Sequence, residues 1–216
     1  MSTPTPGAAA DAVPVRLTPR LVVDTAARLA DAEGIDAVTL SRVARELGVR
    51  QPALYRHVDG IEALWAALAL RARELLVARL TDAAIGRSRE DAIRSVAAAW
   101  RRFVQDHPGL YTVTDRVPST GDPELAASVD RVVGVLALAL SGYALDPGST
   151  VHAARSLRSA LHGFASLEKD EGHPEPYALD DSFEHLVTLL VAGVQATSDR
   201  DHRALQASHP SDARGH

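Results

Sequence analysis

Hydrophobic positions recur along most of this chain at the three- and four-residue spacing of an amphipathic helix. Clear stripes are formed by Val22, Ala26, Leu29 and Ala30 near the N-terminus and by Ile93, Val96, Ala97, Trp100 and Val104 further on. Valine, isoleucine, tyrosine and phenylalanine do not alternate with polar residues over any stretch long enough to suggest a strand. The pattern therefore predicts an all-α protein.

Start and stop signals divide the chain into successive predicted helices. Thr18 and Thr39 are suitable N-caps, Asp59 begins a capping box with Glu62, and Gly48 ends the second helix after about two turns. The predicted helices span residues 18–32, 40–47, 59–80, 88–107, 123–143, 148–169 and 180–197, with a further helix opening near Pro52.

Composition divides the chain into two tails, a head and a body. Residues 1–16 are rich in Ala, Pro, Thr and Gly, and they and residues 199–216 are predicted to be disordered. Between them we expect a small head over residues 17–60 and a larger body over residues 61–198. No signal-peptide pattern opens the chain, there is no cysteine, and no apolar run reaches the ~20 residues of a membrane span. A soluble cytoplasmic protein is expected.

The charge is unevenly distributed. The chain carries a net charge of −5, which by itself argues against a nucleic-acid partner. Between Val15 and Gly60, however, seven arginines face six acidic residues, so this segment is +1 and the remainder is −6. A slightly basic head on an acidic body is typical of a protein whose contact with DNA is local.

Two short helices that meet at Gly48 have the spacing of a helix-turn-helix. Glycine takes the left-handed conformation that a tight turn needs, and the small Ala44 lets the next helix pack closely. We expect a small core closed by Val43, Leu47, Val49 and Leu54. The helix that opens near Pro52 is then free to lie in the major groove of DNA.

The segment from Arg20 to Leu64 resembles the DNA-binding head of the tetracycline-repressor (TetR) family. The matching features, in order, are Thr39-Leu40, Val43-Ala44, Leu47-Gly48-Val49, Leu54-Tyr55-Arg56-His57-Val58 and Glu62-x-Leu64. In the body, Ala160 to Glu168, with its His162-Gly163 pair, and the later Asp181-Ser182-Phe183 resemble one subtype of TetR C-terminal domain. A lysine often begins the fourth helix in this family, whereas Ile61 stands here.

The resemblance implies a double-stranded DNA operator as partner, contacted from the head. Arg50 or Gln51 suit base edges, because arginine pairs with guanine and glutamine with adenine; Tyr55 and His57 are implied as phosphate contacts. The candidate DNA-binding residues are Arg16, Arg20, Ser41, Arg42, Arg50, Gln51, Pro52, Ala53, Tyr55, Arg56 and His57. The alternative is that they are ordinary solvated residues, while Leu54 is assigned to the core.

Aromatic and polar residues of the body are candidates for a pocket that binds a small-molecule effector. They are Trp100, Phe103, His107, Tyr111, Arg116, Tyr143, Arg155 and His162. Ordinary core packing is the alternative for the aromatic ones. Arg155 and His162 have another alternative, which is the outer face of their helix.

Apolar stripes on the last two helices predict a homodimer. They comprise Leu157, Leu161 and Phe164 on one helix and Phe183, Leu186, Val187, Leu190 and Val194 on the other. Two such helices from each subunit would form a four-helix bundle. The alternative is that part of each stripe faces the core of its own subunit.

Other chemistry has little support in the sequence. No His-Glu-x-x-His pair and no two histidines four residues apart occur, so we expect no metal site and no cofactor. No nucleophile motif or phosphate-binding loop is present, so we expect no catalytic residues. The prediction is a transcriptional regulator. Because most members of the family that it resembles are repressors, we expect a repressor that is released by a small molecule. The rivals are a helical ligand-binding protein that no longer binds DNA, and an enzyme.

Overall fold

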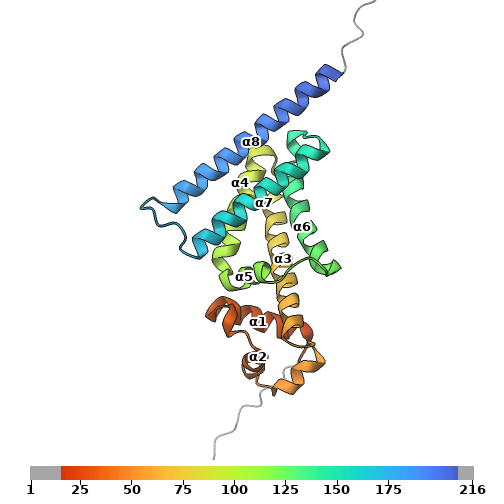
Figure 1. The fold of residues 1–216 in the computed structure, drawn as a ribbon, viewed down its shortest axis with the longest axis vertical. Coiled ribbons are helices and arrows are strands. Elements are labelled where there is room, and N and C mark those ends of the chain that lie inside the picture. The colour runs from red at the N-terminus through yellow and green to blue at the C-terminus, as the bar shows by residue number, and fades with distance from the viewer. Residues whose placement is uncertain (1–15, 209–216) are drawn as a thin grey trace, which may run out of the picture.

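The computed structural model describes residues 16–208, and within that range the protein is helical without a strand (Figure 1). The α-helices are α1 (Pro19–Glu33), α2 (Leu40–Glu46), α3 (Ile61–Ala84), α4 (Arg89–Asp106), α5 (Pro108–Arg116), α6 (Pro123–Ala139), α7 (Pro147–Lys169) and α8 (Leu179–Ser208). Short 3-10 helices are η1 (Ile35–Ala37), η2 (Gln51–Arg56) and η3 (Ser141–Tyr143). The predicted all-α class is confirmed.

Side-chain caps start the two helices that open the head. The Thr18 hydroxyl accepts a hydrogen bond from the Leu21 amide at 3.1 Å, and Thr39 accepts one from the Arg42 amide at 3.1 Å. Both predicted caps are confirmed. The capping box predicted from Asp59 is wrong, because α3 begins two residues later, after Gly60, which has φ +102° and no capping side chain.

Two further boundaries differ from the prediction. The His-Pro-Gly sequence at residues 107–109 ends α4 but also starts α5, a helix that was not predicted, because Pro108 suits the first position of a helix. The predicted tail from residue 199 is also wrong as far as Ser208, because α8 continues to that residue. Asp201 accepts a hydrogen bond from the Asp146 amide, which ties this end of α8 to the start of α7. Of the predicted N-terminal arm, only Arg16 lies within the described residues.

Helix α3 joins two hydrophobic cores. Leu64 and Leu68 pack in the core of the head with α1, α2 and η2, whereas Leu76 and Leu80, about three turns further along, pack in the core of the body. In Figure 1, α3 rises from the head into the body, and α7 and α8 lie at the opposite end of the molecule from α2. A tilt of α3 therefore moves the head relative to the body.

Helix α6, together with η3, is the helical stretch of the described range whose length and mean hydropathy of 1.6 would suit a membrane span. It packs along α3 and α7, with Leu125, Val132 and Leu136 buried. A core helix of a soluble protein has the same composition.

Candidate DNA-binding face and internal cavity

The helix-turn-helix of the head consists of α2, a turn at Gly48 and η2. Gly48 has φ +67°, in the left-handed region that favours glycine, and the Val49 amide donates to the Ala44 carbonyl at 2.9 Å to close the turn. Val43 and Leu54 are fully buried between the elements, so the prediction that Leu54 is a core residue is confirmed. This packing leaves the other face of η2 in solvent.

The exposed side of η2 presents one aromatic and several polar groups. Tyr55 is 52% exposed, and its hydroxyl accepts a 3.4 Å hydrogen bond from the Gln51 side chain. The other candidates in this segment divide into exposed Arg50, Pro52 and Arg56 and half-buried Ala53 and His57. The face can offer hydrogen-bond donors to phosphates and base edges without any change in the core.

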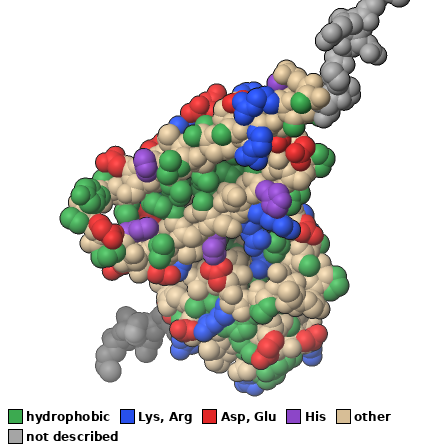
Figure 2. All heavy atoms as spheres, turned by 45° about the horizontal axis from the view of Figure 1, so that its top comes forward, with side chains coloured by type: hydrophobic (Ala, Val, Ile, Leu, Met, Phe, Trp, Pro, Cys, Tyr) green, Lys and Arg blue, Asp and Glu red, His purple; other side chains and the backbone are tan. Residues whose placement is uncertain are grey.

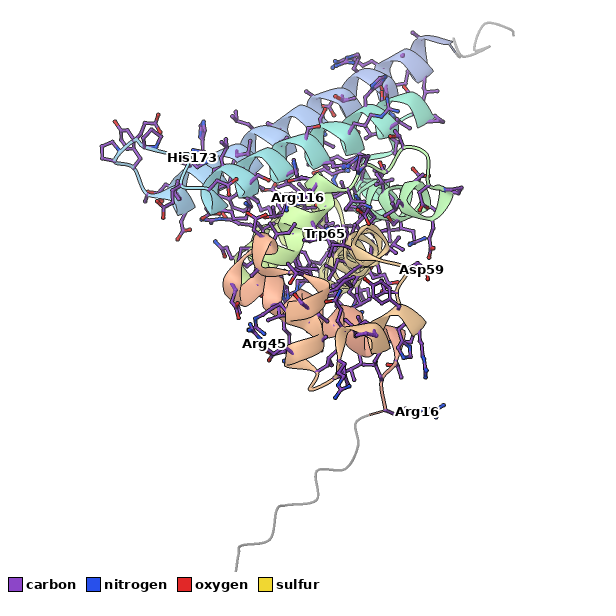
Figure 3. All side chains as sticks on the ribbon, turned by 60° about the horizontal axis from the view of Figure 1, so that its bottom comes forward. Arg16, Arg45, Asp59, Trp65, Arg116 and His173 are labelled. Atoms are coloured by element: carbon purple, nitrogen blue, oxygen red, sulfur yellow. The ribbon has the colours of Figure 1, made fainter. Side chains whose placement is uncertain are left out.

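Further arginines lie around this face. Arg16 is exposed just before α1, Arg20 is exposed in the first turn of α1, and Ser41 is exposed in the first turn of α2. In Figure 3, Arg16 and Arg45 lie at the end of the molecule away from α7 and α8. Sequence reasoning did not select Arg45, an exposed cation in the last turn of α2. Its signal was available, since it lies three residues after Arg42.

Arg42 is already paired inside the head. Its guanidinium donates to Glu46 at 2.7 Å and to Glu33 at 2.6 Å, and these bonds raise the pKa of Arg42 and lower that of Glu46. A phosphate would have to compete with both carboxylates. Arg20 has a looser ion pair with Asp24, at 3.5 Å, and keeps 77% of its side chain exposed.

The body contains a half-open cavity of about 440 Å³, a size suited to a small molecule. Its wall is formed by Arg73, Leu76, Trp100, Tyr111, Thr114, Asp115, Val129, Val132, Arg155, Arg158, Ser159 and His162. Four of the eight predicted ligand-binding residues are among them: Trp100, Tyr111, Arg155 and His162. They come from α4, α5 and α7, which are distant in sequence.

A chain of hydrogen bonds crosses one wall of this cavity. The Trp100 indole donates to the Tyr111 hydroxyl at 3.1 Å, and the same hydroxyl shares a 2.7 Å hydrogen bond with Nδ1 of His162. On the other side of the ring, Nε2 of His162 lies 3.6 Å from a carboxylate oxygen of Asp115. Burial raises the pKa of the Tyr111 hydroxyl well above its usual range, so it remains a neutral donor.

The other four predicted ligand-binding residues lie outside the cavity. Phe103 is 1% exposed and packs its ring against His107 and Tyr111 in the core. Tyr143 is buried under the guanidinium of Arg89. An aromatic stripe marks a buried face, and these two rings fill the core instead of the cavity.

His107 and Arg116 connect the body to the head. His107 lies 2.8 Å from Asp31 of α1, and the same carboxylate accepts a 2.7 Å hydrogen bond from the Leu110 amide of α5. Arg116 donates to Asp36 of η1 at 3.0 Å and lies over the Trp65 ring of α3 (Figure 3). Helix α5 is thereby held against the head at both of its ends.

Several wall residues escaped the sequence analysis. Arg73 lies on the buried stripe of α3 between Ala69 and Leu76, and a charge on an apolar stripe was its available signal. Arg158 and Ser159 follow Arg155 by one helical turn on α7, so helical spacing indicated them too. Thr114 and Asp115 lie on α5, the helix that was not predicted.

The stripes assigned to the dimer interface are mostly buried within one subunit. Six of these residues are buried in the core of their own subunit: Leu157, Leu161, Phe164, Phe183, Val187 and Val194. The other two, Leu186 and Leu190, are partly buried against the same core. Periodicity shows that a helix face is covered but does not show by what. Leu189, in contrast, is 58% exposed.

A groove of about 420 Å³ runs between α7 and α8, and hydrophobic side chains gather along it in Figure 2. Leu189, Leu190 and Val194 contribute from α8, and Ala153 and Leu157 from α7. It is an accessible apolar surface that both of the helices predicted to dimerise share.

Comparison with known proteins agrees with this architecture. Residues 22–68 match the family model described as bacterial regulatory proteins of the tetR family, and residues 93–190 match the tetracyclin repressor-like C-terminal domain. An uncharacterised HTH-type transcriptional regulator of Mycobacterium tuberculosis is 35% identical over 84% of each chain. Another from Bacillus subtilis is 31% identical over 83% of this chain and 94% of that one.

Among solved structures, BioQ in complex with its natural double-stranded DNA operator has a TM-score of 0.63 and 23% identity, over 84% of this chain and 99% of that one. This likeness concerns the fold. The family models and the relatives over 30% identical concern the whole arrangement of head and body. The chain therefore belongs to the TetR family of bacterial transcriptional regulators, which bind DNA through an N-terminal helix-turn-helix.

Proposed function

We propose that this regulator is a cytoplasmic repressor that binds a pseudo-palindromic operator as a homodimer and leaves it when a small molecule fills the body cavity. The observation that carries the proposal is the position of α5. Its Tyr111, Thr114 and Asp115 form part of the cavity wall, while its N-terminal amide at Leu110 binds Asp31 of the head.

Contact with the operator comes from the exposed side of η2. Tyr55, Arg56 and Arg50 reach out from a backbone segment anchored by buried Leu54. Two heads related by a two-fold axis fit two half-sites about one DNA turn, roughly 34 Å, apart or somewhat further. Because arginine–phosphate contacts release counterions, affinity falls steeply as the salt concentration rises.

A ligand changes operator affinity only through a difference in its affinity for two states of the body. A molecule among Trp100, Tyr111 and His162 pushes on α4, α5 and α7 together. Displacement of α5 acts on Asp31, and displacement of α3 acts on the head directly. A coupling of about 1–3 kcal/mol corresponds to roughly 5- to 150-fold weaker DNA binding, and operator DNA weakens ligand binding by the same factor.

Substitutions in η2 test the DNA-binding face. Tyr55→Ala and Arg56→Ala should each weaken binding to DNA from upstream of the protein's own gene at least several-fold, measured by fluorescence anisotropy at two salt concentrations. Both side chains are solvent-exposed, so the thermal stability should stay close to that of the wild type. Tyr177→Ala is the matched control, because Tyr177 is 78% exposed in the loop between α7 and α8.

Wild-type affinity in both η2 variants would contradict the assignment of this face. If the wild-type protein binds the DNA upstream of its own gene no more tightly than random DNA, the protein is not a regulator of that gene.

A further inference from the structure

The cavity wall carries an unbalanced positive charge. Arg73, Arg155 and Arg158 contribute three guanidinium groups, and Asp115 is the acidic residue among the lining side chains. The imidazole of His162, hydrogen-bonded to the Tyr111 hydroxyl, also lines this wall. Such a wall favours a negatively charged occupant over a neutral or cationic one.

Arg73 is the deepest of these cations. It is 7% exposed, and its hydrogen bonds go to neutral oxygens, the Ser128 hydroxyl at 3.3 Å and the Thr114 carbonyl at 3.0 Å. Among residues 16–208 it forms no ion pair, and these bonds use two of its five N–H donors. A buried guanidinium without a carboxylate is unfavourable, so an anionic ligand gains more here than at a solvated arginine.

The charges around Arg73 also favour an anionic ligand. Burial and repulsion from Arg158 lower the pKa of Arg73, and Asp115 only partly opposes this. Arginine stays charged at neutral pH in spite of this shift. In the described part of the chain, Arg155 and Arg158 have no ion pair that would neutralise them.

Apart from the hydroxyl groups of Thr114 and Ser159, the remainder of the wall is apolar or aromatic. Leu76, Val129 and Val132 face the cavity with the buried Trp100. We propose that the effector is an organic anion, a small carboxylate with an apolar or aromatic body, whose carboxylate binds Arg73 and Arg158 and whose body lies against Trp100. This inference rests on the proposed function, since it names the chemistry of the ligand that the cavity takes.

Isothermal titration calorimetry with matched probes tests the charge. Benzoate, 1-naphthoate and octanoate are each compared with the corresponding primary amide, which has almost the same shape but no charge. At least one carboxylate should bind the wild-type protein more tightly than its amide. Arg73→Met should weaken binding of that carboxylate by about 30-fold or more, because the substitution leaves a buried charge without its partner. The affinity for the amide should stay unchanged. Arg73→Lys should recover part of the loss.

Two further variants keep the test independent of folding at Arg73. Arg158→Met, at an exposed residue, should weaken the carboxylate several-fold, and Arg102→Met is the matched control on the exposed side of α4 and should change nothing. The proposal is overturned if no carboxylate is preferred over its amide, or if the preference survives in both Arg73→Met and Arg158→Met.

Operator binding in the presence of the same probes separates this inference from the proposed function. A carboxylate that binds in an Arg73-dependent manner and releases DNA supports both. A carboxylate that binds in that manner without weakening the binding of operator DNA supports the anion site and overturns the effector role of the cavity. Release of DNA by amides but not by carboxylates supports the effector role of the cavity and overturns the inference that the effector is an anion.

Discussion

At the scale of single residues, the buried Arg73 and the partly buried Arg101 have opposite surroundings. Arg101 binds Glu168 through two hydrogen bonds of 2.7 and 2.5 Å, lies 2.8 Å from Asp180, and stacks over the ring of Phe183. The hydrogen-bond acceptors of Arg73 are neutral oxygens only. The Arg101 cluster holds α4 against α7 and α8 and is complete within one chain, whereas Arg73 leaves charge available for a ligand.

The Arg101 cluster makes a prediction about stability. Glu168→Gln removes the main charge partner of a side chain that is 12% exposed, so the free energy of unfolding should fall by about 2 kcal/mol, less than for a fully stranded charge because Asp180 remains. Chemical denaturation measures the change. Glu184→Gln is the control, because Glu184 pairs with Arg94 in solvent and should cost about 0.5 kcal/mol or less. Equal effects of the two substitutions would contradict the special role of Glu168.

At the scale of elements, α5 lies closer to α1 than a side chain permits. A Cβ atom on Gly109 would lie 1.8 Å from the Ala30 carbonyl oxygen, so only glycine allows this approach. The close contact lets the Leu110 amide reach Asp31. Movement of the cavity wall can therefore reach the head through α5 as well as through α3.

Gly109→Ala tests this contact. The methyl group must push α5 away from the backbone of α1, and we expect a loss of about 3 kcal/mol of stability together with weaker coupling between ligand and DNA. The matched control is Gly134→Ala in α6, where a Cβ meets nothing within 4 Å and helix propensity should raise stability by about 0.5–1 kcal/mol. Thermal denaturation and DNA titrations with and without ligand give both quantities. An unchanged melting temperature for Gly109→Ala would rule out the tight α1–α5 contact.

At the scale of the whole molecule, the proposed mode of operator binding requires two heads at a set distance, so a test of the assembly is also a test of the function. The groove between α7 and α8 lies at the end away from the head, and its apolar residues are accessible in a single subunit (Figure 2). Leu190 would be a poor test residue, because it also packs against its own core.

Leu189→Asp is the sharper test of the dimer. The side chain is 58% exposed in one subunit, so a charge there is harmless to folding but costly if a second copy buries it. Sedimentation should show a monomer, with operator affinity strongly reduced. Leu138→Asp, at a residue that is 59% exposed on α6, should leave both properties unchanged. A Leu189→Asp protein that still sediments as a dimer would place the interface elsewhere.

The sequence alone determined the all-α class, the caps at Thr18 and Thr39, the turn at Gly48 and the family, because these depend on helical periodicity and short-range motifs. It did not reveal α5, because the same proline that ends one helix starts the next. The charged half of the cavity and the α1–α5 contact were decided only by the tertiary structure. Arg73, Arg158 and Tyr111 meet from three helices, and Gly109 meets Ala30 across 79 positions. Periodicity reports that a face is buried, but which group lies opposite depends on how the helices cross.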